Sequence, residues 1–135
     1  MGAWSEDTFG NDTACDWTYG LEDVDDFSLV RQAFEAVLNA DDDYLDADIA
    51  SEGLAACEVI ARLKGNWGVR NSYTETVDNW VLSHKIEPPE NLIPTALAVI
   101  DRVIAPQSEL RELWEESGAD EWLIAVEDLR ERVQR

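Results

Sequence analysis

The sequence predicts an all-α domain, a compact bundle of six or seven helices preceded by an ordered, irregular N-terminal arm. Three observations lead to this prediction. Apolar residues recur at steps of three and four through most of the 135-residue chain, and this spacing places them on one face of a helix. Glycine and proline residues divide the chain into segments of helical length. No alternating apolar–polar run is long enough to predict a strand.

The first residues combine large aromatic side chains with turn-forming and helix-capping residues. Trp4 and Phe9 offer large apolar surfaces for burial, and Asn11 or Asp12 can accept the free N–H groups of a helix that starts near residue 13. We therefore expect residues 1–12 to pack as an arm on the helices of residues 13–135, within one domain, because 135 residues suit a single core. The residues assigned to this structural arm are Trp4, Phe9, Asn11, Asp12, Asp16 and Trp17.

The arm also carries a recognisable signature, made of Gly2-Ala3-Trp4, Phe9, Asn11-Asp12, Ala14 and Asp16-Trp17. These residues resemble the opening signature of a bacterial family called domain of unknown function 4259. The resemblance continues in helical segments that begin at Tyr44-Leu45-Asp46-Ala47 and at Ser108. Ser5 departs from the family pattern, which has glycine there, and this affects only the expected turn after Trp4. Because the family has no established activity, the resemblance implies no catalytic residue or ligand.

Two helices are expected directly after the arm. A short one, from about residue 13 to residue 19, brings Trp17 against the core and ends at Gly20. The next is clearly amphipathic and follows a cap at Asp25 or Asp26. Its apolar face contains Phe27, Val30, Phe34, Val37 and Leu38, and its exposed face contains Ser28, Arg31, Gln32 and Glu35.

The middle of the chain predicts two further helices. From about Ala47 to Leu63, small and apolar residues cover more than half of the helix circumference, which predicts a central helix packed on several sides. Cys57 within it is expected to be a buried apolar residue. Ser72 and Glu75 have the spacing of a capping box. The helix that this box opens would carry Tyr73, Val77, Trp80, Val81 and His84 on one side.

Prolines separate the last three predicted helices. Pro88-Pro89 forces a non-helical connection, Pro94 suits a first helical turn, and Pro106 ends that helix. A shorter helix ends at Gly118, and the final helix starts near Ala119. The apolar positions of the three helices are Leu97, Ile100, Val103 and Ile104, then Leu110, Leu113 and Trp114, then Trp122, Val126, Leu129 and Val133. On the opposite side of the final helix, Asp128 and Arg132 form an i,i+4 pair.

The charge balance is extreme, with 30 Asp and Glu residues against 10 Lys and Arg residues and a formal net charge of −20. Such a protein repels phosphate backbones and anionic lipids, so we expect no nucleic-acid or membrane partner. Two interpretations of the acidity stay open, a solvated and salt-adapted surface or a docking face for a basic protein. The densest acidic run is Asp41, Asp42 and Asp43, which with Tyr44 as an aromatic anchor forms the candidate partner-binding site.

The chain lacks an apolar run of the ~20 residues that a membrane span needs. It also lacks the basic and apolar regions of a signal peptide, so a cytoplasmic protein is expected. Cys15 and Cys57 do not form a C-x-x-C pair, and free thiols are expected. The sequence sets no expectation for the oligomeric state.

The acidic stretch of residues 39–48 raises the possibility of a calcium loop. An EF-hand needs an oxygen ligand at its fifth position, where a loop starting at Asp41 has Leu45 and one starting at Asp46 has Ala50. A loop followed by an acidic helix N-terminus explains the same residues, because carboxylates favour the positive end of the helix dipole. We therefore expect no metal and no cofactor.

Few residues suggest catalysis. His84 is the only histidine and lies near a predicted helix C-terminus, where a structural role is ordinary. A thiol–histidine site that joins Cys15 or Cys57 to His84 stays open but has no local motif. Asp12 and Asp16 are the leading carboxylates for catalysis, but Asp12 as a helix cap and Asp16 as a hydrogen-bond anchor for the arm explain both, and we favour this structural interpretation.

Two functions from different classes remain. The preferred one is a non-enzymatic acidic helical protein that binds a basic protein partner, in the manner of an immunity protein or an inhibitor. Carboxylates gathered on one face around an exposed aromatic residue would favour it. The alternative is a small hydrolase or metal-dependent enzyme, which a pocket with two or more buried acids would favour.

Overall fold

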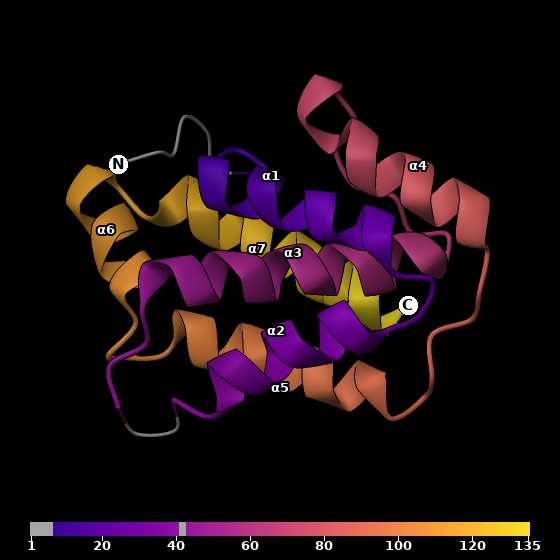
Figure 1. The fold of residues 1–135 in the computed structure, drawn as a ribbon. Helices are drawn as coiled ribbons and strands as arrows, with labels where there is room; N and C mark the ends of the chain where they lie inside the picture. Colours follow the sequence, from indigo (N-terminus) through magenta and orange to yellow (C-terminus); the bar gives the residue numbers. More distant parts are fainter. Residues whose placement is uncertain (1–6, 41–42) are drawn as a thin grey trace.

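The computed structural model describes residues 7–40 and 43–135. Within them the chain forms the elements α1 (Asp12–Tyr19), η1 (Gly20–Asp23), α2 (Ser28–Leu38), α3 (Ala47–Leu63), η2 (Ser72–Thr74), α4 (Glu75–His84), α5 (Leu92–Ile104), α6 (Glu109–Ser117) and α7 (Asp120–Gln134), where η denotes a 3-10 helix (Figure 1). The described residues contain no strand, only an isolated parallel bridge between Leu45 and Ser108. The predicted all-α class is confirmed.

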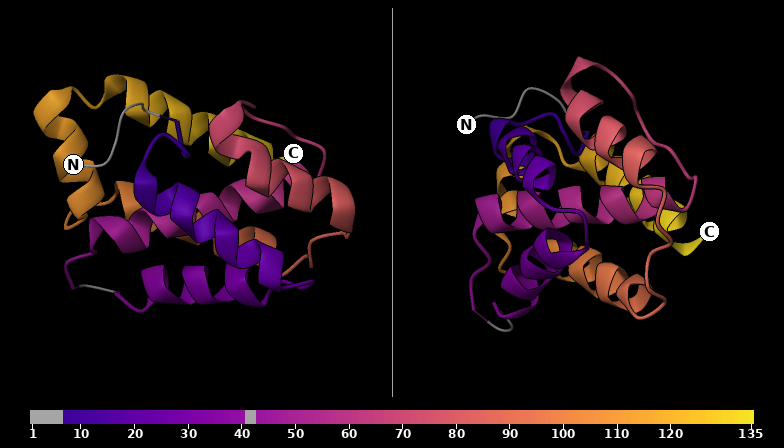
Figure 2. Two further views of the ribbon diagram at one scale, coloured as in Figure 1. Left: turned by 45° about the horizontal axis from the view of Figure 1, so that its top comes forward. Right: turned by 45° about the vertical axis from the view of Figure 1, so that its right-hand side comes forward.

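Helix α3 lies at the centre of the bundle and contacts α1, α2, α4, α5, α6 and α7. Helices α2 and α5 lie on one side of it and α1 and α4 on the other, while α7 runs along a third side (Figures 1 and 2). This arrangement confirms the predicted central helix. Gly53 allows α3 to pack closely against α2 and α5, because a Cβ there would lie 2.6 Å from Cγ2 of Val37 in α2 and 3.1 Å from Cγ1 of Val99 in α5.

The described part of the arm packs on the helices as predicted. Phe9 is 3% exposed and Trp17 is 8% exposed, and both belong to the hydrophobic core. Asn11 caps α1, since its side-chain oxygen accepts a hydrogen bond of 2.8 Å from the backbone N–H of Ala14. The proposed alternative cap, Asp12, is instead the first residue of α1. Trp4 lies outside the described residues.

Three local predictions are wrong in detail. Leu38 is 37% exposed at the end of α2, rather than on the buried face. The capping box is formed by Asn71 and Thr74, not by Ser72 and Glu75, because the Asn71 side chain accepts from the backbone at Tyr73 and the Thr74 hydroxyl accepts from the backbone at Asn71. Consequently a short 3-10 turn precedes α4, and it leaves Tyr73 51% exposed.

The remaining helices follow the sequence pattern closely. Gly118, with a φ of 96°, ends α6, and Pro94 lies in the first turn of α5. All four predicted apolar positions of α7 are buried, namely Trp122, Val126, Leu129 and Val133. Over residues 7–40 and 43–135, no helix has both the length and the apolar character needed to cross a bilayer.

Candidate functional site

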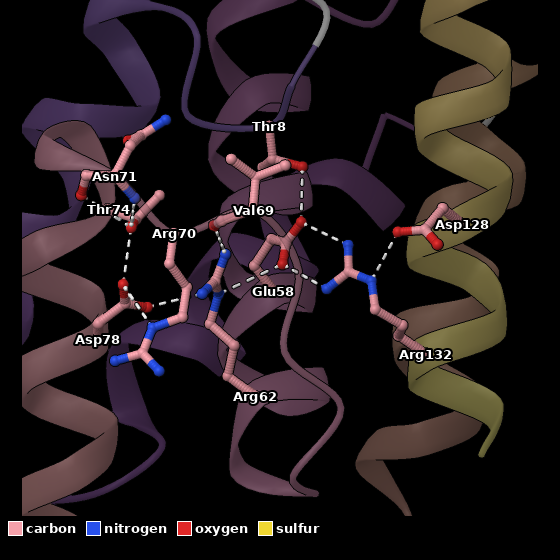
Figure 3. Close-up of polar contacts among 10 residues, drawn as sticks. All are labelled: Thr8, Glu58, Arg62, Val69, Arg70, Asn71, Thr74, Asp78, Asp128 and Arg132. Atoms are coloured by element: carbon pink, nitrogen blue, oxygen red, sulfur yellow. Dashed lines mark hydrogen bonds and ion pairs between the residues drawn. The ribbon is translucent and has the colours of Figure 1, made fainter.

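Four charged side chains are buried in the interior of this acidic protein. Glu58 and Arg62 are one turn apart on α3, Asp78 lies on α4 and Arg132 lies on α7 (Figure 3). Their exposed fractions are only 2–6%. Buried charges must be paired and hydrogen-bonded to be tolerated, and these four residues form a connected ionic network that joins three helices.

The first half of the network centres on Glu58. The Arg132 guanidinium donates two hydrogen bonds to it, from Nη1 to Oε1 at 2.8 Å and from Nη2 to Oε2 at 2.9 Å. The Thr8 hydroxyl donates to Oε2 at 3.0 Å, and Arg132 Nε donates to Oδ2 of Asp128 at 2.8 Å. Burial acts to raise the pKa of Glu58, but the bonds and charges of Arg132, Arg62 and Thr8 hold it below its usual value. Glu58 is therefore an ionised carboxylate at neutral pH.

The second half centres on Asp78. Arg62 Nη1 lies 2.6 Å from Oδ1 of Asp78, and the Thr74 hydroxyl donates to Oδ2 at 2.7 Å. Arg62 Nη2 also donates to the carbonyl oxygen of Val69 at 2.8 Å. Arg62 Nε lies 3.4 Å from Oε1 of Glu58 without making a hydrogen bond, so Arg62 links the two halves by charge.

The segment after α3 is shaped by this network. A Cβ on Gly68 would lie 2.7 Å from the guanidinium carbon of Arg132, so a larger residue there would displace this guanidinium. The Asn66 side chain donates to the backbone carbonyl of Arg132 at 2.9 Å, and Lys64 donates to the carbonyl of Val133. The segment therefore bridges α3 and the end of α7.

An open groove of about 610 Å³ lies above the network. Glu58, Arg62 and Arg132 line it from α3 and α7, and its walls come from the arm, the segment of residues 69–74 and α7. The full lining is Asp7, Thr8, Phe9, Gly10, Glu58, Arg62, Val69, Asn71, Tyr73, Thr74, Glu121, Ile124, Ala125, Asp128 and Arg132. We refer to this feature as the groove.

The groove gathers exposed apolar side chains and carboxylates. Val69, Tyr73 and Ile124 line it and are 51%, 51% and 69% exposed, and Ile124 is the most exposed large apolar residue in the described part of the chain. Glu121 lies three residues before Ile124 and Asp128 four residues after it, on the same face of α7. An exposed aromatic residue among carboxylates is the arrangement that would favour the binding hypothesis over the enzyme hypothesis.

The described residues of the predicted partner-binding site, Asp43 and Tyr44, lie elsewhere. Asp41 and Asp42 fall outside the described residues, and neither Asp43 nor Tyr44 lines the groove. Tyr44 is 55% exposed, and its hydroxyl donates to Oε1 of Glu112 at 2.6 Å. This hydrogen bond raises the pKa of Tyr44 to about 12. A role of Asp43 and Tyr44 in partner binding stays a prediction.

The residues considered for catalysis do not form a site in the described part of the chain. His84 Nε2 lies 2.8 Å from Oδ1 of Asp25, Nδ1 lies 2.8 Å from the carbonyl oxygen of Trp80, and the ring stacks on Trp80. Cys57 is fully buried, and burial raises its pKa well above the usual value. Burial and nearby carboxylates also raise the pKa of Cys15, so neither thiol is set up as a thiolate nucleophile.

The acidic residues of the arm have surface positions. Asp12 and Asp16 are exposed, and the Asp16 side chain makes no hydrogen bond within residues 7–40 and 43–135. Because residues 1–6 of the arm lie outside the described residues, its role as an anchor for the arm stays a prediction. Within residues 7–40 and 43–135, no group of three or more His, Cys, Asp and Glu side chains is arranged to hold a metal ion.

Sequence reasoning missed the buried network. The predicted Asp128–Arg132 pair exists, but Arg132 is 5% exposed and reaches inward, not into solvent. One signal was present in the sequence, since Glu58 and Arg62 interrupt the otherwise small and apolar run of residues 53–63 at i,i+4 spacing. Their partners are 16 and 74 residues away along the chain, and no local pattern connects them.

Comparison with known proteins places the chain in a family. The family described as domain of unknown function (DUF4259) matches residues 2–125, nearly the whole chain. The match includes Glu58, Arg62 and Asp78 and most of the groove, whereas Asp128 and Arg132 follow it. No curated protein and no solved structure matches the chain significantly. On the extent of the family match, the chain belongs to the DUF4259 family.

Proposed function

We propose that the protein is a non-enzymatic binding protein whose groove engages a basic protein partner. The observation that carries the proposal is the grouping of exposed Val69, Tyr73 and Ile124 with the carboxylates of Glu121 and Asp128. Exposed apolar side chains rimmed by polar ones are typical of interaction sites. The formal charge of −20 surrounds the groove with a negative potential that attracts a basic protein and repels an acidic one.

The buried network supports this proposal by holding the groove in shape. It ties α3, α4 and α7 to each other, and Thr8 ties the arm to Glu58. Apart from Arg62 Nε, the charged groups of the network are hydrogen-bonded, and such buried polar networks make the surrounding structure rigid. A rigid groove loses less conformational entropy when a partner binds, and this improves affinity.

The geometry gives the alternative, a carboxylate-based enzyme, no comparable support. General acid–base catalysis by two carboxylates needs one of them to keep its proton near neutral pH. The pKa of Glu58 is instead lowered, and Asp78 receives hydrogen bonds from Arg62 and Thr74. Both buried acids are therefore engaged in structural ion pairs.

An immunity-like or inhibitor-like role is the specific form of this function that we propose. In that role the basic partner is a toxin or an enzyme. When the partner occupies the groove, the acidic surface would lie against the face of the partner that carries its active site. The candidate site at Asp43 and Tyr44 offers a second surface for the same partner, because Tyr44 is exposed beside acidic residues.

Affinity capture with matched variants tests the proposal. Immobilised wild-type protein is compared with Glu121→Lys in the groove, Glu131→Lys on the same helix outside the groove, and Asp43→Lys in the acidic run. Glu121 and Glu131 are both exposed, so the two variants make the same charge change. We expect a basic protein that elutes at raised salt, is retained by Glu131→Lys and is lost with Glu121→Lys.

Each outcome of the capture decides between the surfaces. Loss of capture with Asp43→Lys but not with Glu121→Lys would place the binding site at the acidic run and contradict the proposal for the groove. Equal capture by all four proteins, or capture of acidic proteins alone, would contradict both sites. Circular dichroism of each variant confirms that the fold is intact.

A further inference from the structure

We infer that a second pocket, lined by the segment after α3 and by the end of α4, binds a small monocarboxylate with an apolar body. The pocket has a volume of about 490 Å³, and its lining comes from residues 62–67 and 81–87. This volume lies within the range of small-molecule sites. The inference concerns a different place from the groove and does not depend on the proposed function.

The wall of the second pocket is largely apolar, and its tryptophan is held in place. The apolar lining residues are Leu63, Trp67, Val81, Leu82 and Ile86. Leu82 is 46% exposed, so part of this wall faces solvent. The guanidinium carbons of Arg62 and Arg70 lie 5.7 and 4.4 Å from the centre of the Trp67 ring and fix its position. An apolar wall with few polar groups is typical of a site for a small ligand.

Lys85 is the cation that such a ligand would meet. It lines the pocket and is exposed, and its ammonium group makes no hydrogen bond or ion pair within residues 7–40 and 43–135. Its backbone has a φ of 26°, a left-handed conformation that glycine adopts freely and lysine only against a steric penalty. The contacts of the described residues therefore give no reason for a lysine here, and strained residues of this kind gather at functional sites.

The charges around the second pocket favour a single carboxylate. Residues 59–74 form the longest stretch of the chain without Asp or Glu, although the net charge is −20. Arg62 lines the pocket but is paired with Asp78 at 2.6 Å, so Lys85 is the lining cation that can bind an anion. Glu87 also lines the pocket and would repel a second negative charge. The pocket therefore suits a monoanion better than a phosphate or a dicarboxylate.

Two probes of nearly the same shape test the inference. The probes 1-naphthylacetate and 1-naphthylacetamide share an apolar ring system and differ in the negative charge, and each is titrated into the full chain by isothermal titration calorimetry. At physiological salt the repulsion from distant carboxylates is screened, because the Debye length is about 8 Å. One hydrogen bond from Lys85 to the carboxylate predicts roughly three- to tenfold tighter binding of naphthylacetate.

Two pairs of variants locate the site. Lys85→Met keeps an unbranched side chain without the charge and should abolish the preference for naphthylacetate. Lys64→Met removes the other lysine of the chain, which does not line the pocket, and should keep the preference. Leu82→Glu places a carboxylate on the wall and should abolish binding of naphthylacetate. Ile124→Glu places one in the groove and should leave that binding unchanged.

Lys85→Gly tests the strain separately. Glycine accepts the left-handed backbone, so this variant should melt at a higher temperature than the wild type and still lose the preference for naphthylacetate. A lower melting temperature would show that Lys85 stabilises the end of α4 and would contradict the argument from strain.

Three binding results would overturn the inference. They are equal or undetectable binding of the two probes at millimolar concentration, a preference that survives Lys85→Met, and loss of binding with Ile124→Glu but not with Leu82→Glu. Circular dichroism confirms that each variant is folded.

Discussion

Arg132 and Glu58 join the last helix to the central helix through two parallel hydrogen bonds of 2.8 and 2.9 Å, although they lie 74 residues apart in the sequence. Both side chains are almost completely buried. A buried ion pair adds little net stability compared with an apolar pair, but the removal of one partner leaves the other charge buried and uncompensated. The pair therefore makes the native contact of α7 with α3 specific.

Arg132→Ala is expected to lower the free energy of unfolding by roughly 3–5 kcal/mol, because Glu58 then stays buried without its main partner. Urea denaturation measures the change. Arg130→Ala is the matched control on α7, since Arg130 pairs with the exposed carboxylates of Asp101 and Glu127. Its expected cost is below about 1 kcal/mol. Equal losses in the two variants would contradict a special role of the buried pair.

The same variant should change the pH dependence of stability. In the wild type the lowered pKa of Glu58 contributes stability above the pKa of an unfolded glutamate, and this contribution is lost as the pH falls through the folded pKa. Without Arg132, burial should raise the pKa of Glu58 instead. The difference in stability between wild type and Arg132→Ala should therefore shrink as the pH falls from the raised Glu58 pKa of the variant to the lowered Glu58 pKa of the wild type, and denaturation at several pH values measures it.

His84 is expected to titrate above the ordinary histidine pKa, because Asp25 and the carbonyl of Trp80 both stabilise the imidazolium. A raised folded pKa contributes stability that is fully present below the unfolded pKa and is lost as the pH rises through the folded value. As the only histidine, His84 gives a single imidazole signal in a proton NMR titration. Asp25→Asn should lower its pKa, whereas Asp23→Asn should have little effect. An unchanged pKa in Asp25→Asn would refute the contact.

Gly53→Ala should destabilise the protein by about 1–3 kcal/mol through overpacking, because the new Cβ would overlap Val37 and crowd Val99. The sign is diagnostic, since the same change at an exposed helical site stabilises by up to about 1 kcal/mol. Val37→Ala relieves the overlap and should cost less in the Gly53→Ala background than in the wild type. Thermal denaturation of the four proteins completes the cycle, and additive effects would count against the contact.

The arm is expected to contribute to stability through burial of Phe9. Phe9→Ala should cost roughly 3–5 kcal/mol for a fully buried ring, and Phe27→Ala should cost less because Phe27 is only partly buried. A chain that begins at Asn11 also lacks Trp4 and the Thr8–Glu58 bond, and it should melt at a lower temperature than the full chain. An unchanged melting temperature for the shortened chain would show that the arm is not part of the folding unit.

The helices were largely predictable because they depend on local information. Apolar spacing and a few capping, glycine and proline residues place α2, α3 and α7 close to their observed bounds. The wide apolar face of residues 47–63 also identified the central helix. The misplaced capping box shows the limit of this reasoning, because Ser72–Glu75 and Asn71–Thr74 offer competing caps and backbone geometry selects between them.

By itself the sequence determined the all-α class, the central position of α3, the buried arm residue Phe9 and the formal net charge of −20. Only the tertiary structure decided that Arg132 turns inward to Glu58 and that Val69, Tyr73 and Ile124 meet at one groove. The physical reason is the sequence separation over which each kind of interaction acts. Helix formation and capping act between residues a few positions apart, whereas a buried charge is stabilised by a partner that folding brings from elsewhere in the chain.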